Sequence, residues 1–172
     1  MKTLSLFICL LMLSGCASRG LTIRDVPTIQ AANIKVPTFR GLPQKSLSIE
    51  VVDMRSDDLK GNSAVVVAEV DRALVSALNS NQVPVSPTGA NALVLSIHNG
   101  PVGAYEQGCV KLEASLNVPK RANLKAQSSA CFESKLPFGK KVVGTDISKA
   151  YEEALTLILL NLDQALQKMS YL

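Results

Sequence analysis

Two alternating stretches in the second half of the chain limit the possible folds more than any other feature of the sequence. Between Cys109 and Val118, and again between Ala122 and Phe132, most even-numbered positions are apolar and most odd-numbered positions are polar. A period of two predicts half-buried β-strands. Residues 119–121 (Pro-Lys-Arg) separate the stretches and are typical of a turn. The sequence therefore predicts a β-hairpin.

Pairing the two strands about Lys120 brings both apolar sets to one face, as a stable register requires. This register places Val118 opposite Ala122, Leu116 opposite Leu124, and Ala114 opposite Ala126. It also places Cys109 opposite Cys131 on the polar face. Directly opposed residues lie about 4.5–5.5 Å apart, which is within reach of a disulfide. We expect this disulfide to be structural. A catalytic redox pair would need Cys-x-x-Cys spacing, which the chain lacks, and a zinc site is disfavoured because the chain has a single histidine.

Four further segments show clear periods. Residues 46–53 and the stretch around Leu93, Leu95 and Ile97 alternate like strands. Helical spacing runs from about Val66 to Asn79 and from about Ile147 to Met169. The valines at 65–67 are also compatible with a short strand.

The predicted order is strand, helix, strand, strand, strand, helix. This order favours an α+β domain over residues 46–172, in which two helices pack on one face of a mostly antiparallel four-stranded sheet. The other face would carry Lys111, Glu113, Lys125, Gln127 and the disulfide, and would point toward solvent or a partner.

The first sixteen residues have the pattern of an export signal. Lys2 precedes the apolar run Leu4–Leu13, which is too short to span a bilayer, and Leu13-Ser14-Gly15-Cys16 follows. This ending resembles the bacterial lipobox. The resemblance implies that residues 1–15 are a cleaved signal peptide and that Cys16 carries a covalent lipid such as palmitate. The alternative is an ordinary secretory signal cut nearby, which would leave Cys16 free.

A lipid on Cys16 would anchor the chain to a membrane without a spanning helix. By resemblance to the enterobacterial sorting rule, Ala17 implies the outer membrane, with the domain on the periplasmic face, where disulfides persist. Removing fifteen of the 172 residues leaves 157, enough for one domain. Residues 16–45, which hold Pro27, Pro37 and Pro43, are expected to form a lipidated tether, although pieces such as residues 34–36 can dock on the domain.

The charge distribution argues against nucleic-acid binding. The net charge of +4 falls to +3 when Lys2 is removed, and the charges are dispersed along the chain.

The candidate catalytic and metal-binding residues each have a simpler structural explanation. His98 lacks a Gly-x-Ser-x-Gly motif or a comparable nucleophile elbow. The acidic side chains of Asp53, Asp57 and Asp58 suit calcium, but their spacing does not match an EF-hand loop. We expect Asp53 to pair locally with Arg55 in a solvated loop. We therefore predict no enzyme activity, no metal site and no cofactor other than the covalent lipid.

Two exposed regions are candidate contact sites. Lys140 and Lys141, together with Arg121, can meet phosphate headgroups or can simply be solvated loop charges. Tyr105 lies in a glycine-rich stretch that is either a contact loop or a plain connection.

The chain resembles the small YajG-type lipoproteins. The likeness rests on the ending at 13–16, the proline-containing tether, the strand that ends in Val52-Asp53-Met54-Arg55, the helix with Leu74 and Leu78, and the late hairpin and terminal helix. It also resembles the auxiliary lipoproteins of lipid-transport ABC systems. The first family brings no established activity, and the second implies an accessory role in moving lipids.

The leading hypothesis is a non-enzymatic accessory lipoprotein of the cell envelope that binds another envelope protein. The contact would lie on the open face of the sheet or at a sheet edge, with Lys111, Glu113, Lys125 and Tyr105 as candidate contact residues. The alternative is an auxiliary subunit of an envelope lipid-transport system, which would need an apolar groove between helix and sheet. A hydrolase is the third possibility, and the sequence offers it no triad, metal motif or paired carboxylates.

Overall fold

A computed structural model describes residues 26–42, 44–55, 62–99, 108–121, 123–132 and 144–169. Its elements follow the order η1 (Ala31–Asn33), β1 (Leu47–Asp53), α2 (Ser63–Ser80), β2 (Asn91–Asn99), β3 (Gly108–Asn117), β4 (Leu124–Phe132) and α3 (Gly144–Met169). The prediction of an α+β fold is confirmed. The predicted order differs from this one because it lacks the 3-10 turn η1 that precedes β1.

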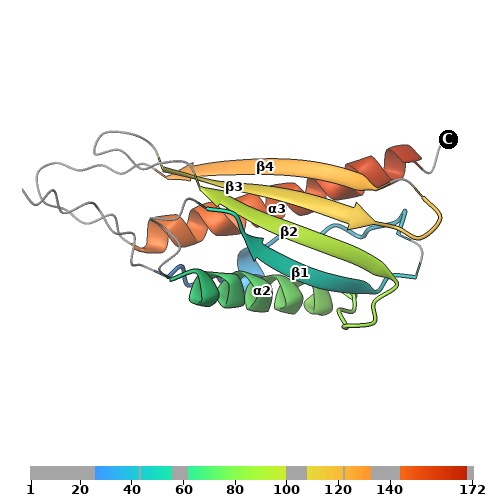
Figure 1. Cartoon of the computed structure of the whole chain (residues 1–172), viewed down its shortest axis with the longest axis horizontal. Helices are drawn as coiled ribbons and strands as arrows, with labels where there is room; N and C mark the ends of the chain where they lie inside the picture. The colour runs from blue at the N-terminus through green and yellow to red at the C-terminus, as the bar shows by residue number, and fades with distance from the viewer. Residues whose placement is uncertain are drawn as a thin grey trace, which may run out of the picture.

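The four strands form one sheet in the order β1-β2-β3-β4 (Figure 1). β2 pairs antiparallel with β3, and β3 pairs antiparallel with β4. β1 pairs parallel with β2, with Ile49 beside Leu93 and Val51 beside Leu95. The prediction of a mostly antiparallel sheet is therefore wrong, and the sheet is mixed. The physical reason is that α2 carries the chain from β1 back to the same end of the sheet, which is how parallel neighbours are joined.

The hairpin has the predicted register. Leu116 pairs with Leu124, Ala114 with Ala126, and Cys109 with Cys131. The turn is closed by the backbone N–H of Arg121, which donates to the Val118 carbonyl over 3.0 Å. Lys120 adopts a positive φ of 63° there. Ala122 lies outside the described residues, so its predicted pairing with Val118 stays a prediction.

Both helices bury one apolar stripe against the sheet (Figure 1). In α2 the stripe has helical spacing and comprises Val66, Val70, Ala73, Leu74, Ala77 and Leu78, so residues 65–67 are helical rather than a strand. In α3 it includes Tyr151, Leu155, Ile158 and Leu162, each 1 % exposed or less. The alternate residues of β2 and β3 complete the same core, which includes Leu95, Ile97, Val110 and Leu112.

α3 also contacts β4 through polar groups. The Ser128 hydroxyl donates to the Ala154 carbonyl, and the Asn161 side-chain amide donates to the Gln127 carbonyl, each over 2.8 Å. These bonds fix the long helix along the last strand of the sheet. None of the described helices is long and apolar enough to cross a bilayer.

Residues 26–42, which we call the N-terminal segment, belong to the packed domain, although the sequence predicted them to be part of the tether. The side chains of Ile29, Ile34, Phe39 and Leu42 are all 5 % exposed or less. The segment runs along both helices, with Ile29 bonded to α2 and Lys35 bonded to Thr156 of α3. The described domain therefore begins at residue 26 rather than 46. The physical reason is that these four apolar side chains complete the core.

Candidate functional site

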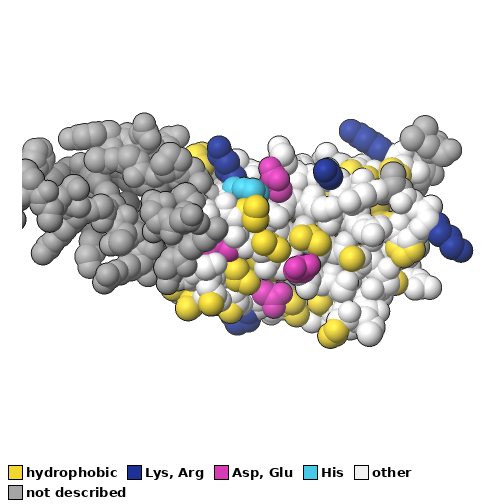
Figure 2. All heavy atoms as spheres, in the orientation of Figure 1, with side chains coloured by type: hydrophobic (Ala, Val, Ile, Leu, Met, Phe, Trp, Pro, Cys, Tyr) yellow, Lys and Arg dark blue, Asp and Glu magenta, His cyan; other side chains and the backbone are white. Residues whose placement is uncertain are grey.

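The face of the sheet opposite the helices is the largest candidate surface among the described residues. We call it the open face and define it by the outward-pointing residues of the four strands: Ser48, Glu50, Val52, Ala92, Val94, Ser96, His98, Cys109, Lys111, Glu113, Ser115, Lys125, Gln127, Ser129 and Cys131. Alternation along each strand puts these side chains on the side away from the buried core. Figure 2 looks onto this face.

The open face has a charged half and a more apolar half. Lys111 and Glu113 on β3 and Lys125 on β4 are exposed. Over β1 and β2 the face carries Ala92, and half-buried Val52 and Val94, with Glu50 among them. Basic side chains over one half and apolar side chains over the other are visible in Figure 2. An apolar centre beside polar groups is the usual make-up of a protein-binding surface.

Glu113 connects three strands across the charged half. The Gln127 side-chain amide of β4 donates to Glu113 Oε1 over 3.0 Å. His98 Nε2 of β2 lies 3.6 Å from Glu113 Oε2. The pairing of β2 with β3 also sets His98 directly beside Lys111. The structure therefore brings three candidate contact residues, Lys111, Glu113 and Lys125, onto one face, while Tyr105 lies outside the described residues.

The His98 side chain is partly exposed on the open face, at 33 % of its surface. Among the described residues, no hydroxyl or thiol forms a hydrogen bond with its Nε2 atom. Its nearest charged partner is the exposed Glu113 carboxylate. A general base needs a nucleophile within hydrogen-bonding distance. Within the part of the chain that the structure describes, no three His, Cys, Asp or Glu side chains gather as a metal site would require.

Asp53 and Arg55 form a buried ion pair at the end of β1. Arg55 Nε donates to Asp53 Oδ1 over 2.8 Å, and Nη2 donates to Oδ2 over 2.6 Å. Their side chains are 4 % and 3 % exposed. The predicted local pairing is confirmed, but the pair is buried rather than solvated. Asp57 and Asp58 lie outside the described residues.

Electrostatics hold both members of this pair in their charged forms. Burial alone would raise the pKa of Asp53, but hydrogen bonds from Arg55 and Ser63 outweigh it and lower the pKa from 3.8 to about 2. Burial would lower the pKa of Arg55, and the Asp53 carboxylate, with a smaller effect of Tyr151, raises it instead. Arg55 Nη2 also donates to Asn62 Oδ1 over 3.3 Å. The pair therefore joins the end of β1 to the start of α2, and its role is structural.

The sequence itself contains a signal for this burial. Residues 47, 49 and 51 of β1 face the helices, so Asp53 falls on the same inward face by simple alternation. An acidic residue at an inward position needs a partner, and Arg55 is the nearest basic residue in the chain.

Three polar side chains of the helices hold the N-terminal segment by its backbone. Successive N–H groups of Thr28, Ile29 and Gln30 donate to Ser148, Glu69 and Glu152 over 2.8–2.9 Å. Ser148 and Glu152 lie on α3, and Glu69 lies on α2. These three residues were not predicted, because nothing in the helical period marks them as hydrogen-bond acceptors for a backbone segment far away in the sequence.

Arginine side chains add further bonds to this attachment. Arg72 Nη2 donates to the Ile29 carbonyl over 2.9 Å, and it also pairs with Glu69. The hydrogen bond from Arg72 lowers the pKa of Glu69. Arg121, a candidate for phosphate contact, instead donates to the Gly41 carbonyl over 3.1 Å. Lys140 and Lys141 lie outside the described residues.

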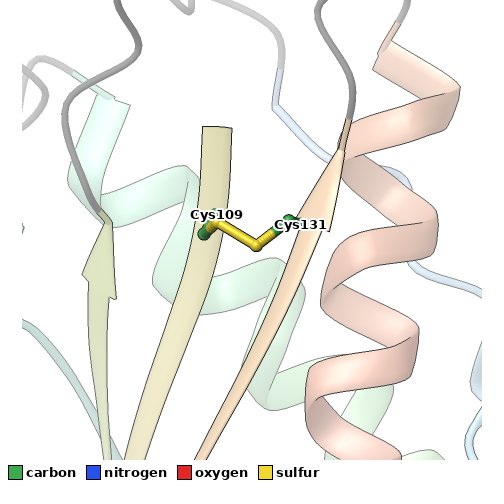
Figure 3. The surroundings of a disulfide bond; sticks show 2 residues. All are labelled: Cys109 and Cys131. Carbon is green, nitrogen blue, oxygen red and sulfur yellow. A yellow bond between two sulfur atoms is a disulfide. The ribbon is translucent and has the colours of Figure 1, made fainter. Parts of the chain in front are cut away.

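The structure contains the disulfide expected from the hairpin register (Figure 3). The Cα atoms of Cys109 and Cys131 lie 4.0 Å apart on neighbouring strands. Cys131 is exposed and Cys109 is half-buried, so the bond sits on the open face beside the charged half. Its position joins β3 to β4 at the end opposite the hairpin turn.

Replacing both cysteines by serine is expected to lower the free energy of unfolding by roughly 3 kcal/mol, because the unfolded chain regains the freedom of the closed loop. Urea unfolding followed by circular dichroism measures this loss. Dithiothreitol should lower the stability of the unsubstituted chain to the level of the variant and should leave the variant unchanged. Equal stability of the two chains under oxidising conditions would contradict the expectation.

Comparisons with known proteins show a shared fold and no close sequence relative. No protein-family model matches the chain, and no curated protein matches it. A protein of family DUF330 from Xanthomonas campestris superposes with a TM-score of 0.55 at 11 % identity, and the match covers 85 % of this chain and 98 % of that one.

Two further solved structures resemble the chain more weakly. PelC from Paraburkholderia phytofirmans, solved as a dodecamer, gives a TM-score of 0.44 at 13 % identity and covers 73 % of this chain and 92 % of that one. A minor lipoprotein from Acinetobacter baumannii gives 0.41 at 14 % identity, with 75 % and 95 % covered. The resemblance to YajG-type lipoproteins stays a prediction. This chain is thus similar in fold to the Xanthomonas campestris protein of family DUF330.

Proposed function

We propose that this chain is a membrane-anchored, non-enzymatic accessory lipoprotein of the bacterial envelope, which binds another envelope protein through the open face of its sheet. The observation that carries the proposal is that both helices pack on one side of the sheet. The other side presents a charged half beside an apolar half to the surroundings. Ion pairs and a polar network set orientation in such a contact, and apolar side chains supply burial.

The anchor is supported by the sequence. A ten-residue, mostly apolar run that ends at Leu13 and is followed by Ser14-Gly15-Cys16 is the arrangement that a lipoprotein signal peptidase requires. A lipid on Cys16, with Ala17 after it, would place the domain on the periplasmic face of the outer membrane. Cells grown with labelled palmitate should incorporate label into the full-length chain and not into a Cys16→Ala variant. Recovery of the labelled chain in the inner-membrane fraction would contradict the sorting assignment.

Site-specific cross-linking tests the partner surface. A photo-reactive amino acid at position 94 or 111, on the open face, should yield the same dominant adduct with one envelope protein. The matched control is position 153, which is exposed on α3 on the other side of the domain. Cys16→Ala should abolish the adduct, because the chain is then not lipidated and not sorted to the outer membrane.

The identity and pattern of the adducts decide between the hypotheses. Adducts of equal yield from positions 94 and 153 would contradict a specific open-face contact. A permease or substrate-binding subunit of a lipid transporter, captured from positions 94 and 111, would assign the chain to the auxiliary lipid-transport role. Capture of abundant porins alone would count against an accessory role.

A further inference from the structure

One end of the domain carries the two most exposed large apolar side chains among the described residues. Met54, directly after β1, is 56 % exposed, and Val65, in the first turn of α2, is 53 % exposed. Val26 and Ala68 line a shallow surface pocket together with Val65. We call Val26, Met54, Val65 and Ala68 the apolar tip.

The two elements that carry Met54 and Val65 are joined by the contacts already described. Arg55 donates to Asn62, and Asp53 accepts a hydrogen bond from Ser63, so the end of β1 is bonded to the start of α2. The backbone of Ile29 is bonded to Glu69, which lies six residues after Ser63 on the same helix. The segment that begins at Val26 therefore leaves the described domain beside the start of α2, at the left end of α2 in Figure 1.

The length of chain before Val26 ties this end to the proposed anchor. Val26 comes ten positions after Cys16. Whatever the conformation of the chain between them, ten positions span at most about 36 Å. α2 extends for 18 residues, which is about 27 Å, and leads away from the tip toward Ser80. If Cys16 is acylated, the chain joins the membrane anchor to the end of the domain that carries the apolar tip, and Ser80 lies about 27 Å further from that attachment along α2.

We propose that the apolar tip rests on the lipid surface into which the acyl chains of Cys16 insert. This inference rests on the proposed anchoring of the chain. The anchor makes the contact intramolecular, so exposed apolar side chains that would bind lipid weakly on their own are held at high effective concentration. The open face then stands beside the membrane rather than against it, and it is available to a partner that itself lies close to the membrane.

Fluorescence quenching in vesicles tests this arrangement. In the proposed mature chain, which begins at the acylated Cys16, no thiol is free, because Cys109 and Cys131 are disulfide-bonded and Cys16 carries the lipid. A single introduced cysteine, V65C or M54C, can therefore be labelled with an environment-sensitive fluorophore. The labelled chain is reconstituted in vesicles of phosphatidylethanolamine and phosphatidylglycerol that contain spin-labelled lipid. The matched control is S80C, at the exposed far end of the same helix.

The expected result is that the labels at 65 and 54 lose most of their emission, whereas the label at 80 keeps it. A second substitution, V65E, should restore emission from the label at 54 while flotation with the vesicles is unchanged. Equal quenching at 65 and 80, or quenching at neither in a chain that floats, would overturn the tip contact and leave the anchor intact.

Two further outcomes are distinguishable from these. If emission from the label at 65 changes with the amount of protein per vesicle and not with the amount of spin-labelled lipid, the tip contacts a second copy of the chain. This result would overturn the lipid contact. A chain that does not float, with no acyl mass on its Cys16 peptide, would overturn the proposed anchor and the inference together.

Discussion

A chain that begins at residue 46 is expected not to fold, although the alternating and helical patterns all lie downstream of that residue. The shortened chain lacks the four buried side chains of the N-terminal segment: Ile29, Ile34, Phe39 and Leu42. Each such side chain contributes about 1.5–3 kcal/mol when fully buried. The total, about 6–12 kcal/mol, is comparable with the whole stability of a typical domain. Circular dichroism and urea unfolding of chains starting at residues 17 and 46 measure the effect.

A single substitution checks the same point without shortening the chain. Phe39→Ala is expected to cost about 3–5 kcal/mol because it leaves a cavity in the core. Arg40→Ala, at the exposed neighbouring position, should stay within about 0.5 kcal/mol of the unsubstituted chain. If the chain from residue 46 unfolds at the same urea concentration as the longer chain, residues 26–42 are a tether after all.

Arg55→Ala is expected to destabilise the domain by about 3–5 kcal/mol, because it leaves the Asp53 carboxylate buried without its partner. The pair is enclosed, with both side chains 4 % exposed or less. Arg72→Ala breaks an ion pair of similar geometry whose arginine is 56 % exposed, and it should cost much less. Urea unfolding of both variants gives the comparison. Replacing both partners by apolar residues, as in Asp53→Leu with Arg55→Met, should recover much of the loss.

The pH dependence of unfolding provides a second readout of this pair. Because the folded pKa of Asp53 is about 2, below the ordinary value of 3.8, the pair stabilises the fold fully above pH 3.8. That contribution is lost as the pH falls through about 2. The stability difference between the unsubstituted chain and Arg55→Ala should therefore narrow over this range. A difference that is independent of pH, or a loss below about 1 kcal/mol at neutral pH, would show that the pair is not buried as described.

The elements with a clear local period could be predicted from the sequence. Alternation gave the hairpin, its register and the opposition of Cys109 and Cys131, and helical spacing gave α2 and α3. The same alternation predicted that Lys111, Glu113 and Lys125 share a face. Alternation gives the face of a side chain but not the register between strands joined by a long connection, so the proximity of His98 to Glu113 was not predicted.

Two features were missed for identifiable reasons. The apolar residues of the N-terminal segment fall at positions 29, 34, 39 and 42, a spacing that matches neither a strand nor a helix. Side chains of α2 and α3 bind the backbone of this segment, so the sequence of the segment alone does not indicate that it packs on the domain. The parallel pairing of β1 with β2 was indicated by the strand-helix-strand order, which commonly forms a parallel unit. The predicted order of elements is therefore compatible with the mixed sheet.

The attachment of the N-terminal segment to α3 has a consequence for the order of folding. Thr28, Gln30 and Lys35 form hydrogen bonds with residues about 120 positions later in the chain. If the chain is exported from its N-terminus, as proposed above, the first part of the domain to emerge must wait for the last helix. Contacts of such long sequence separation slow folding. The domain is expected to stay incompletely folded until the whole chain has crossed the membrane, which keeps it in a state that a translocation channel can pass.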